Sequence, residues 1–204
     1  SYYDYYQPES YMPATDQYIE KDAAINPKLD QMRLAATAAV LGRPDTIIVA
    51  SVSCIYGLGN PKNYMGFRFS LEKNQNISRK EILTKLIHSQ YQRNDTELQP
   101  GRFRVKGDII DFIPSDINNI IRVELFGDKI ERIIEIDKIT GEKVQDWEHF
   151  TVYPAKHFMI PEEELDEAIE DIKGQLKEDL PGLEMLEAHR LKQRTEYDIE
   201  MIKE

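Results

Sequence analysis

The spacing of apolar positions changes along the chain, and each spacing predicts a different element. Between Ser78 and Tyr91 apolar residues recur at the three-to-four spacing of an amphipathic helix, and Ser78 with Glu81 can form a capping box. From Gly101 the period becomes two, as expected for strands with one buried face. The apolar stripe of the predicted helix consists of Ile82, Leu83, Leu86, Ile87 and Tyr91.

Turn signals divide the period-two region into short strands. The best turns are Gly127-Asp128 and Thr140-Gly141, where glycine supplies the backbone freedom that tight turns need. Strands that follow one another through short turns form an antiparallel meander with one face inward. The sequence therefore predicts an α+β module of roughly ninety residues, which is large enough to fold alone.

The segment before this module predicts one helix and one strand. Asn26 and Pro27 are a good helix start, and the helix should extend to about Leu41. Thr46 to Val52 is a short β-branched run between turns, which is typical of a buried strand in a parallel sheet. The break GLGNP at residues 57 to 61 is the first predicted domain boundary.

Two helices are expected after the module. Pro161 opens an acidic helix, Pro181-Gly182 interrupts it, and a second helix begins near Leu183. The chain from Glu162 onward holds 15 acidic and 6 basic residues, so it supplies most of the net charge of −11. This negative net charge does not favour electrostatic binding of DNA, so any binding of DNA must come from shape and stacking.

Tyrosines are concentrated at the start of the chain. Six of the eleven tyrosines are Tyr2, Tyr3, Tyr5, Tyr6, Tyr11 and Tyr18. The doublets place rings on both faces of any strand, so the run has no single apolar face for a core. A phenol ring is a flat surface with a polar tip, suited to stacking on bases or to an interface. The open alternative is an edge strand whose rings pack on another domain.

Residues 1 to 25 predict a β-hairpin that turns at Pro13–Asp16. The register places Tyr11 opposite Tyr18, Tyr5 opposite Ala24, Tyr6 opposite Ala23, and Glu9 opposite Glu20. Two glutamates directly opposite repel each other, so Glu9 is expected to lean diagonally toward Lys21. Pairing rings with alanines leaves a slot beside the rings that would suit a strand of DNA.

Motifs for catalysis are missing from the sequence. It contains no G-x-x-x-x-G-K-[ST] loop, and its carboxylates show no acid–base pattern. The four histidines are far apart, without the paired spacing of a metal site, and the single Cys54 cannot form an internal disulfide. We therefore expect neither catalysis nor a metal site in this chain. A single cysteine is typical of a reducing compartment, and no run resembles a signal peptide or a membrane span, so we expect a cytoplasmic location.

Alternating cations mark one predicted strand. Arg102, Arg104 and Lys106 should share its outward face, and Arg122 with Glu124 should share a face of the next strand. Such a pattern fits a solvated polar face or a surface that docks an acidic or mixed partner, because arginine is favoured at interfaces. Direct DNA binding is a weaker alternative, because acidic residues dilute the patch.

Several stretches closely resemble the UvrB family, the excinuclease subunits of bacterial nucleotide excision repair. They include YYDYYQPESYMPATDQYIEKD, GRFRVKGDIIDFIP, RVELFGDKIERI and LKQRTEYDIEMI, and the resemblance to an internal stretch of the family extends over essentially the whole chain. It implies an α+β chain in which a superfamily 2 helicase-like α/β motor flanks an inserted module. The implied parts are a hairpin at 1–25, motor at 26–62, a UvrA-interaction domain at 63–154, and helical motor at 155–204.

The resemblance also implies roles for particular residues. In the family the hairpin inserts between the DNA strands at a lesion. Tyr2 and Tyr3 would set its base, Tyr5 and Tyr6 would probe the damaged strand, Tyr11 and Tyr18 would lie at the tip, and Glu9 with Lys21 would lock one strand. The residues that match the UvrA contact are Arg93, Arg104, Lys106, Arg122 and Glu124.

The implied partners are UvrA, damaged DNA and, through the intact subunit, UvrC. ATP and Mg²⁺ would be bound by the intact subunit, a DNA-dependent ATPase, and no cofactor is expected in this chain. An alternative is the transcription-repair coupling factor, which carries a similar UvrA-binding module. The tyrosine-rich hairpin, which that factor lacks, favours UvrB. A free-standing nuclease or ATPase has no supporting motif.

Overall fold

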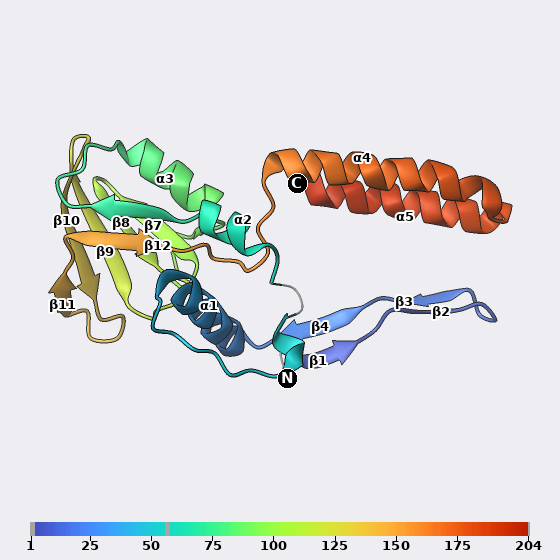
Figure 1. Ribbon diagram of the computed structural model, residues 1–204, viewed down its shortest axis with the longest axis horizontal. Coiled ribbons are helices and arrows are strands. Elements are labelled where there is room, and N and C mark those ends of the chain that lie inside the picture. The colour runs from blue at the N-terminus through green and yellow to red at the C-terminus, as the bar shows by residue number, and fades with distance from the viewer. Residues whose placement is uncertain (1–2, 56–57, 204) are drawn as a thin grey trace. The chain divides into compact units, whose positions relative to one another are not determined.

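The computed structural model describes residues 3–55 and 58–203, and its chain divides into two compact units, Ser1–Met159 and Ile160–Glu204 (Figure 1). Helices and strands both contribute, in agreement with the predicted α+β class. None of the helices in the described part is long and apolar enough to cross a membrane.

The tyrosine-rich segment forms the predicted hairpin, here called the tyrosine hairpin. Strand β1 (Tyr3–Gln7) pairs antiparallel with β4 (Asp22–Ile25), and β2 (Ser10–Met12) pairs with β3 (Gln17–Ile19). The turn is closed by the Thr15 amide, which donates to the Met12 carbonyl at 3.2 Å. The pairs Tyr11–Tyr18, Tyr5–Ala24 and Tyr6–Ala23 confirm the predicted register.

Helix α1 (Pro27–Gly42) begins where the sequence predicts, because the Asn26 side chain accepts hydrogen bonds from the amides of Lys28 and Leu29. Its buried Leu34 packs in a small cluster with Tyr64 and Met159.

The predicted strand at Thr46 to Val52 is wrong. Residues 46–51 have no regular structure, a short 3₁₀ helix η1 (Val52–Ile55) follows, and the side chains of Ile47 and Val49 are 90% and 96% exposed. A strand of a parallel sheet is held by neighbouring strands, and no described strand pairs with this segment. A β-branched composition without such partners does not hold a strand.

The predicted module begins with α2 (Pro61–Gly66), followed by β5 (Phe69–Glu72) and α3 (Arg79–His88). The capping box is present, because the Ser78 hydroxyl accepts from the Glu81 amide and the Glu81 carboxylate accepts from the Ser78 amide. Strand β5, which the sequence did not predict, pairs antiparallel with β12 (His149–Val152).

A six-stranded sheet forms the body of this module, which we call the sheet module. Its spatial order is β11 (Lys143–Asp146), β10 (Lys129–Ile136), β9 (Ile120–Phe126), β8 (Ile109–Ile113), β7 (Arg102–Lys106) and β6 (Gln92–Arg93). The strands from β7 to β11 are antiparallel neighbours in sequence order, which confirms the meander. The short strand β6 is parallel to β7 and was not predicted.

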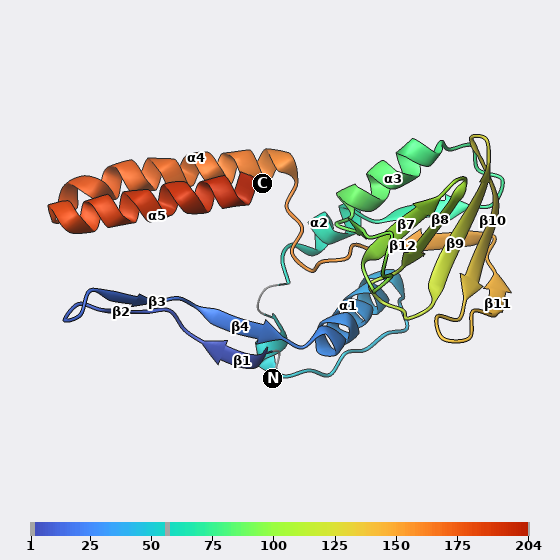
Figure 2. The same ribbon diagram turned by 180° about the vertical axis from the view of Figure 1, so that it is seen from behind.

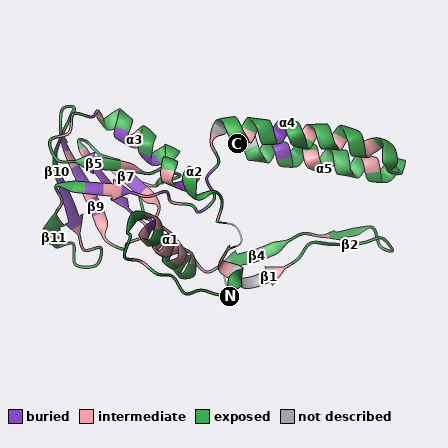
Figure 3. Cartoon of the chain, in the orientation of Figure 1, coloured by how far each residue is buried: buried purple, intermediate pink, exposed green. Residues whose placement is uncertain are grey.

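The core lies on one face of this sheet, where α3 and the β5–β12 pair cover it (Figure 3). At its centre Phe112 is fully buried and meets Tyr91 and Phe150 edge to face, with both centroid distances at 6.1 Å. Ile82 and Leu86 of the predicted stripe are buried, but Ile87 is 60% exposed, which corrects that part of the prediction.

The second unit is a helical hairpin. Helix α4 (Glu162–Asp179), the short η2 (Leu180–Gly182) and α5 (Met185–Lys203) follow the predicted order. In both views α4 and α5 lie side by side (Figures 1 and 2). Ile169 and Ile199 are buried while most acidic residues are exposed, as expected for an acidic solvated face.

Candidate functional site

The face of the six-stranded sheet that points away from the core carries a row of charges. Arg104 on β7 is the register partner of Asp111 on β8, and Asp111 is the register partner of Arg122 on β9. Residues opposite each other in neighbouring strands point to the same side of a sheet. These three residues therefore define one face, here called the charged face.

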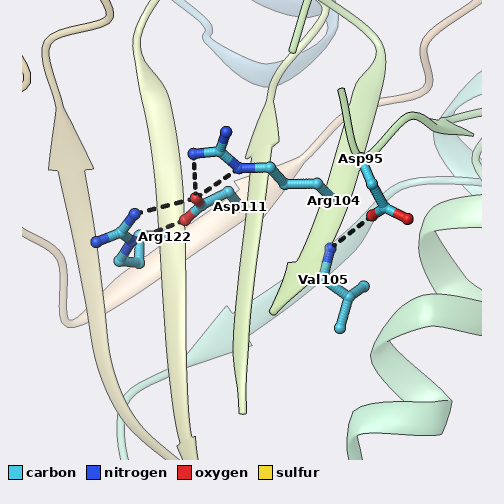
Figure 4. Close-up of polar contacts among 5 residues, drawn as sticks. All are labelled: Asp95, Arg104, Val105, Asp111 and Arg122. Atoms are coloured by element: carbon cyan, nitrogen blue, oxygen red, sulfur yellow. Dashed lines mark hydrogen bonds and ion pairs between the residues drawn. The ribbon is translucent and has the colours of Figure 1, made fainter. Parts of the chain in front are cut away.

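Asp111 holds both arginines at once (Figure 4). Arg104 donates from Nε and Nη2 to Asp111 Oδ2 at 3.1 and 2.8 Å. Arg122 donates from Nε to Asp111 Oδ1 at 2.7 Å and from Nη2 to Oδ2 at 3.0 Å. The Asp111 side chain is 3% exposed, against 25% and 31% for the side chains of Arg104 and Arg122, so the acid lies beneath the two guanidinium groups.

The arginines also set the ionisation of the buried acid. Burial raises the pKa of Asp111, but the hydrogen bonds and charges of Arg122 and Arg104 outweigh burial and hold that pKa below its usual range. Asp111 is therefore a carboxylate at neutral pH, and the hydrogen bond to it is the largest cause of the raised pKa of Arg122.

This pKa predicts how stability depends on acid. A carboxylate whose folded pKa lies below its unfolded value of about 3.9 contributes stability that is fully present above that value and is lost as pH falls through the folded pKa. Asp111→Asn should therefore lower stability at neutral pH and make it fall less below about pH 4. Urea unfolding of the wild-type and Asp111→Asn chains at neutral and acidic pH, followed by Trp147 fluorescence, measures this difference in stability. The control is Asp108→Asn, which removes an exposed carboxylate. Parallel stability curves for Asp111→Asn and wild type would contradict the assignment.

The charged face continues on both sides of this cluster. Lys106 lies two residues beyond Arg104 on β7 and is exposed, and Glu124 lies two residues beyond Arg122 on β9. Arg132 on β10 reaches Glu124 at 3.7 Å and Asp146 on β11 at 3.3 Å. Charges of both signs thus alternate across the strands.

Four of the five predicted partner-contact residues, Arg104, Lys106, Arg122 and Glu124, share this face. Arg93 does not, because it is the register partner of Phe103, whose side chain points into the core. Arg93 lies on the edge strand and pairs with Asp95 at 3.0 Å, and Asp95 also accepts from the Val105 amide at 3.3 Å. The five residues therefore do not form one continuous row.

The expected row of three outward cations on β7 needs correction. Arg102 and Arg104 are half-buried, and of the three residues only Lys106 is exposed. Arg104 is half-buried because it pairs with Asp111, a contact that the sequence pattern did not predict. The sequence did contain a signal for this contact. Asp111 is an acid in the middle of the apolar run Ile109–Ile113, and the preceding and following predicted strands carry Arg104 and Arg122.

The described tip of the tyrosine hairpin exposes its rings. Tyr11 and Tyr18 are 43% and 44% exposed. The Tyr11 hydroxyl donates to Asp16 Oδ1 at 2.8 Å and the Tyr18 hydroxyl donates to Glu9 Oε2 at 2.6 Å. The contact of Glu9 with Lys21 stays a prediction. Tyr2 lies outside the described residues, as do the side chains of Tyr3, Tyr5 and Tyr6, whose backbone forms β1.

Comparison with known proteins assigns both units to one family. Residues 69–158 match the family model "UvrB interaction domain" and residues 163–204 match "UvrB third helical domain". All 204 residues align with proteins named UvrABC system protein B: 64% identity in Methanosarcina acetivorans and 60% in Methanococcus maripaludis. The protein of that name in Staphylococcus epidermidis is 51% identical over 209 aligned residues.

The fold and these matches define a chain that joins an α+β interaction domain to a helical domain. The chain belongs to the UvrB family. It spans about a third of the length of these relatives, between 30% and 32%. Among the residues that the structure describes, no group of three or more His, Cys, Asp or Glu side chains could hold a metal ion.

Proposed function

We propose that this chain supplies the UvrA-docking domain and the lesion-probing hairpin of a UvrB subunit in the UvrABC excision repair system. The observation that carries the proposal is the charged face, in a domain that matches the UvrB interaction domain. Charges fixed on a rigid sheet fit protein docking, because complementary charges steer encounter and select the partner.

The sheet suits this role because its two faces are separate in function. The core face packs against α3 and the β5–β12 pair, and that packing keeps the strands in register. The charged face has a buried carboxylate at its centre, so its arginines have defined positions before any partner arrives. Groups that are already positioned lose less conformational entropy on binding.

The tyrosine hairpin is the part that we propose to contact DNA. It is a two-stranded ribbon with exposed rings at Tyr11 and Tyr18, and alanines stand opposite Tyr5 and Tyr6. Stacking of a base on an aromatic ring contributes about 1–3 kcal/mol and acts through the face of the ring rather than through a charge. This fits a chain whose net charge is −11. On this proposal Glu9 and Lys21 help to hold one strand behind the hairpin.

The remaining segments would belong to a helicase-like motor of the intact subunit. The exposed Ile47 and Val49 support this, because a β-branched run of that kind fits a strand that is completed by neighbours from the rest of a sheet. The intact subunit, rather than this chain, would bind ATP and Mg²⁺ and recruit UvrC.

The docking proposal predicts that Lys106→Glu weakens binding to UvrA at least about tenfold, a change of about 1.4 kcal/mol. Lys106 is an exposed cation of the charged face that lies on the same strand as Arg104, so its replacement tests the surface without removing a partner of Asp111. Isothermal titration of the 204-residue chain with purified UvrA measures the effect.

The control is Lys138→Glu, which makes the same charge reversal in the exposed turn between β10 and β11. It should bind like wild type. Equal weakening by both substitutions would point to general charge repulsion and would remove the support for a specific docking face. No binding by the wild-type chain would refute docking by this domain alone.

A further inference from the structure

We propose that Asp111 is a positioning residue, which holds Arg104 and Arg122 as a paired guanidinium site for one carboxylate of the partner protein. The inference deepens the proposed docking function and rests on it. Asp111 itself would not touch the partner, because its side chain is 3% exposed beneath both arginines.

The hydrogen bonds show which edges of the arginines Asp111 uses. Both guanidinium groups turn their Nε and Nη2 edges toward Asp111, which accepts four hydrogen bonds between 2.7 and 3.1 Å (Figure 4). None of these four hydrogen bonds uses Nη1 of Arg104 or Nη1 of Arg122. Each planar guanidinium has more donors than Asp111 occupies, and the unused donors can bind a second carboxylate.

The geometry also explains why a buried acid is needed between the two cations. The guanidinium groups of Arg104 on β7 and Arg122 on β9 lie on either side of β8 and repel each other, and in the absence of a shared counter-ion they would move apart into solvent. The Asp111 carboxylate removes this repulsion and fixes both planes through paired hydrogen bonds. The arginines are thereby kept close enough to act together on one acidic group.

A carboxylate of a protein fits this site better than the phosphates of DNA. Glu124 and Asp146 lie on the same face, at 3.7 and 3.3 Å from Arg132, so a polyphosphate chain crossing the face would meet fixed negative charges. Tight binding of DNA phosphates needs several cations without such interruptions. A protein surface can place an acid on the arginine pair and cations beside it.

Two substitutions distinguish an effect of Asp111 on the positions of the arginines from an effect of its negative charge on UvrA binding. Asp111→Asn and Asp146→Asn each remove one negative charge from the same face, and each carboxylate contacts two cations. If only charge mattered, both changes would tighten binding to an acidic site on UvrA. Positioning predicts instead that Asp111→Asn weakens binding about tenfold or more, while Asp146→Asn, whose carboxylate is 47% exposed, leaves it unchanged or tighter.

The experiment is a titration of wild-type and variant chains with purified UvrA, with the melting temperature of each chain measured alongside. Wild-type binding together with equal or tighter binding by Asp111→Asn overturns this inference and leaves the docking function standing. Absence of wild-type binding overturns the docking function and the inference with it.

Arg104→Lys keeps the test decisive if Asp111→Asn fails to fold. Lysine preserves the charge but cannot donate in the fixed fork of a guanidinium, so binding should again weaken about tenfold. A second readout needs no partner: in nitrogen-15 NMR spectra the Nε–H signals of Arg104 and Arg122 should exchange slowly with water in the wild-type chain and rapidly in Asp111→Asn. Wild-type affinity of Arg104→Lys, or unchanged exchange in Asp111→Asn, contradicts the inference.

Discussion

Arg104→Glu should lower the free energy of unfolding of the sheet module by about 3 kcal/mol or more, in addition to any effect on binding. The substitution removes one partner of the nearly buried Asp111 and places a second carboxylate beside it. The change is costly because the nearly buried Asp111 keeps only Arg122 as a counter-ion while a second carboxylate lies beside it. The sequence pattern alone predicts the opposite, an exposed cation whose reversal leaves the fold intact.

Urea unfolding, followed by the fluorescence of Trp147, measures this effect. Trp147 is the single tryptophan of the chain and packs edge-on against Phe150 in the core, with 5.5 Å between the ring centroids. Lys106→Glu is the matched control, since the same reversal at an exposed site of the same strand should change stability by no more than about 0.5 kcal/mol.

A second substitution tests the cause of the loss. In the Arg104→Glu background, Asp111→Asn should restore part of the stability, because it removes the repulsion between two carboxylates. Equal stability of wild type and Arg104→Glu would show that the contact with Asp111 contributes nothing to folding.

Tyr5→Ala combined with Tyr6→Ala should weaken loading of the full-length subunit onto damaged DNA at least about thirtyfold. Loss of two stacking rings removes about 2–6 kcal/mol, and each 1.4 kcal/mol corresponds to a factor of about ten. UvrA binding should persist, because β1 and the charged face are separate elements. A gel-shift titration with a duplex that carries one defined lesion measures loading, and calorimetry measures UvrA binding.

The control for this double substitution is Tyr197→Ala on α5, which removes a ring that is 61% exposed and lies outside the tyrosine hairpin. It should load like wild type. Loss of both loading and UvrA binding in the double variant would indicate that the rings support the fold rather than contact DNA.

Local signals predicted most of the elements correctly. The capping box at Ser78, the cap at Asn26 and the turn at Pro13–Asp16 each depend on residues close in sequence, and the structure contains all three. The strand expected at Thr46 to Val52 failed because a buried strand depends on neighbours far away in the chain.

The candidate site was predicted less completely, for a related reason. Alternation along β7 correctly placed Arg104 and Lys106 on one face, but it could not show what lies across the sheet. The link from Arg104 through Asp111 to Arg122 exists only once three strands are in register. Strand β6 was missed because two residues are too few to show a period.

The short strand β6 leaves part of the backbone edge of β7 without a neighbouring strand. It covers only Arg102 and Phe103 of β7, and beyond it the Val105 amide donates to the Asp95 side chain instead of to another strand. An open backbone edge is a template for strand addition by a second molecule, and a charged side chain on that edge prevents it. Asp95 therefore places a negative charge and an occupied acceptor where a second copy of the strand would have to pair, which disfavours edge-to-edge self-association.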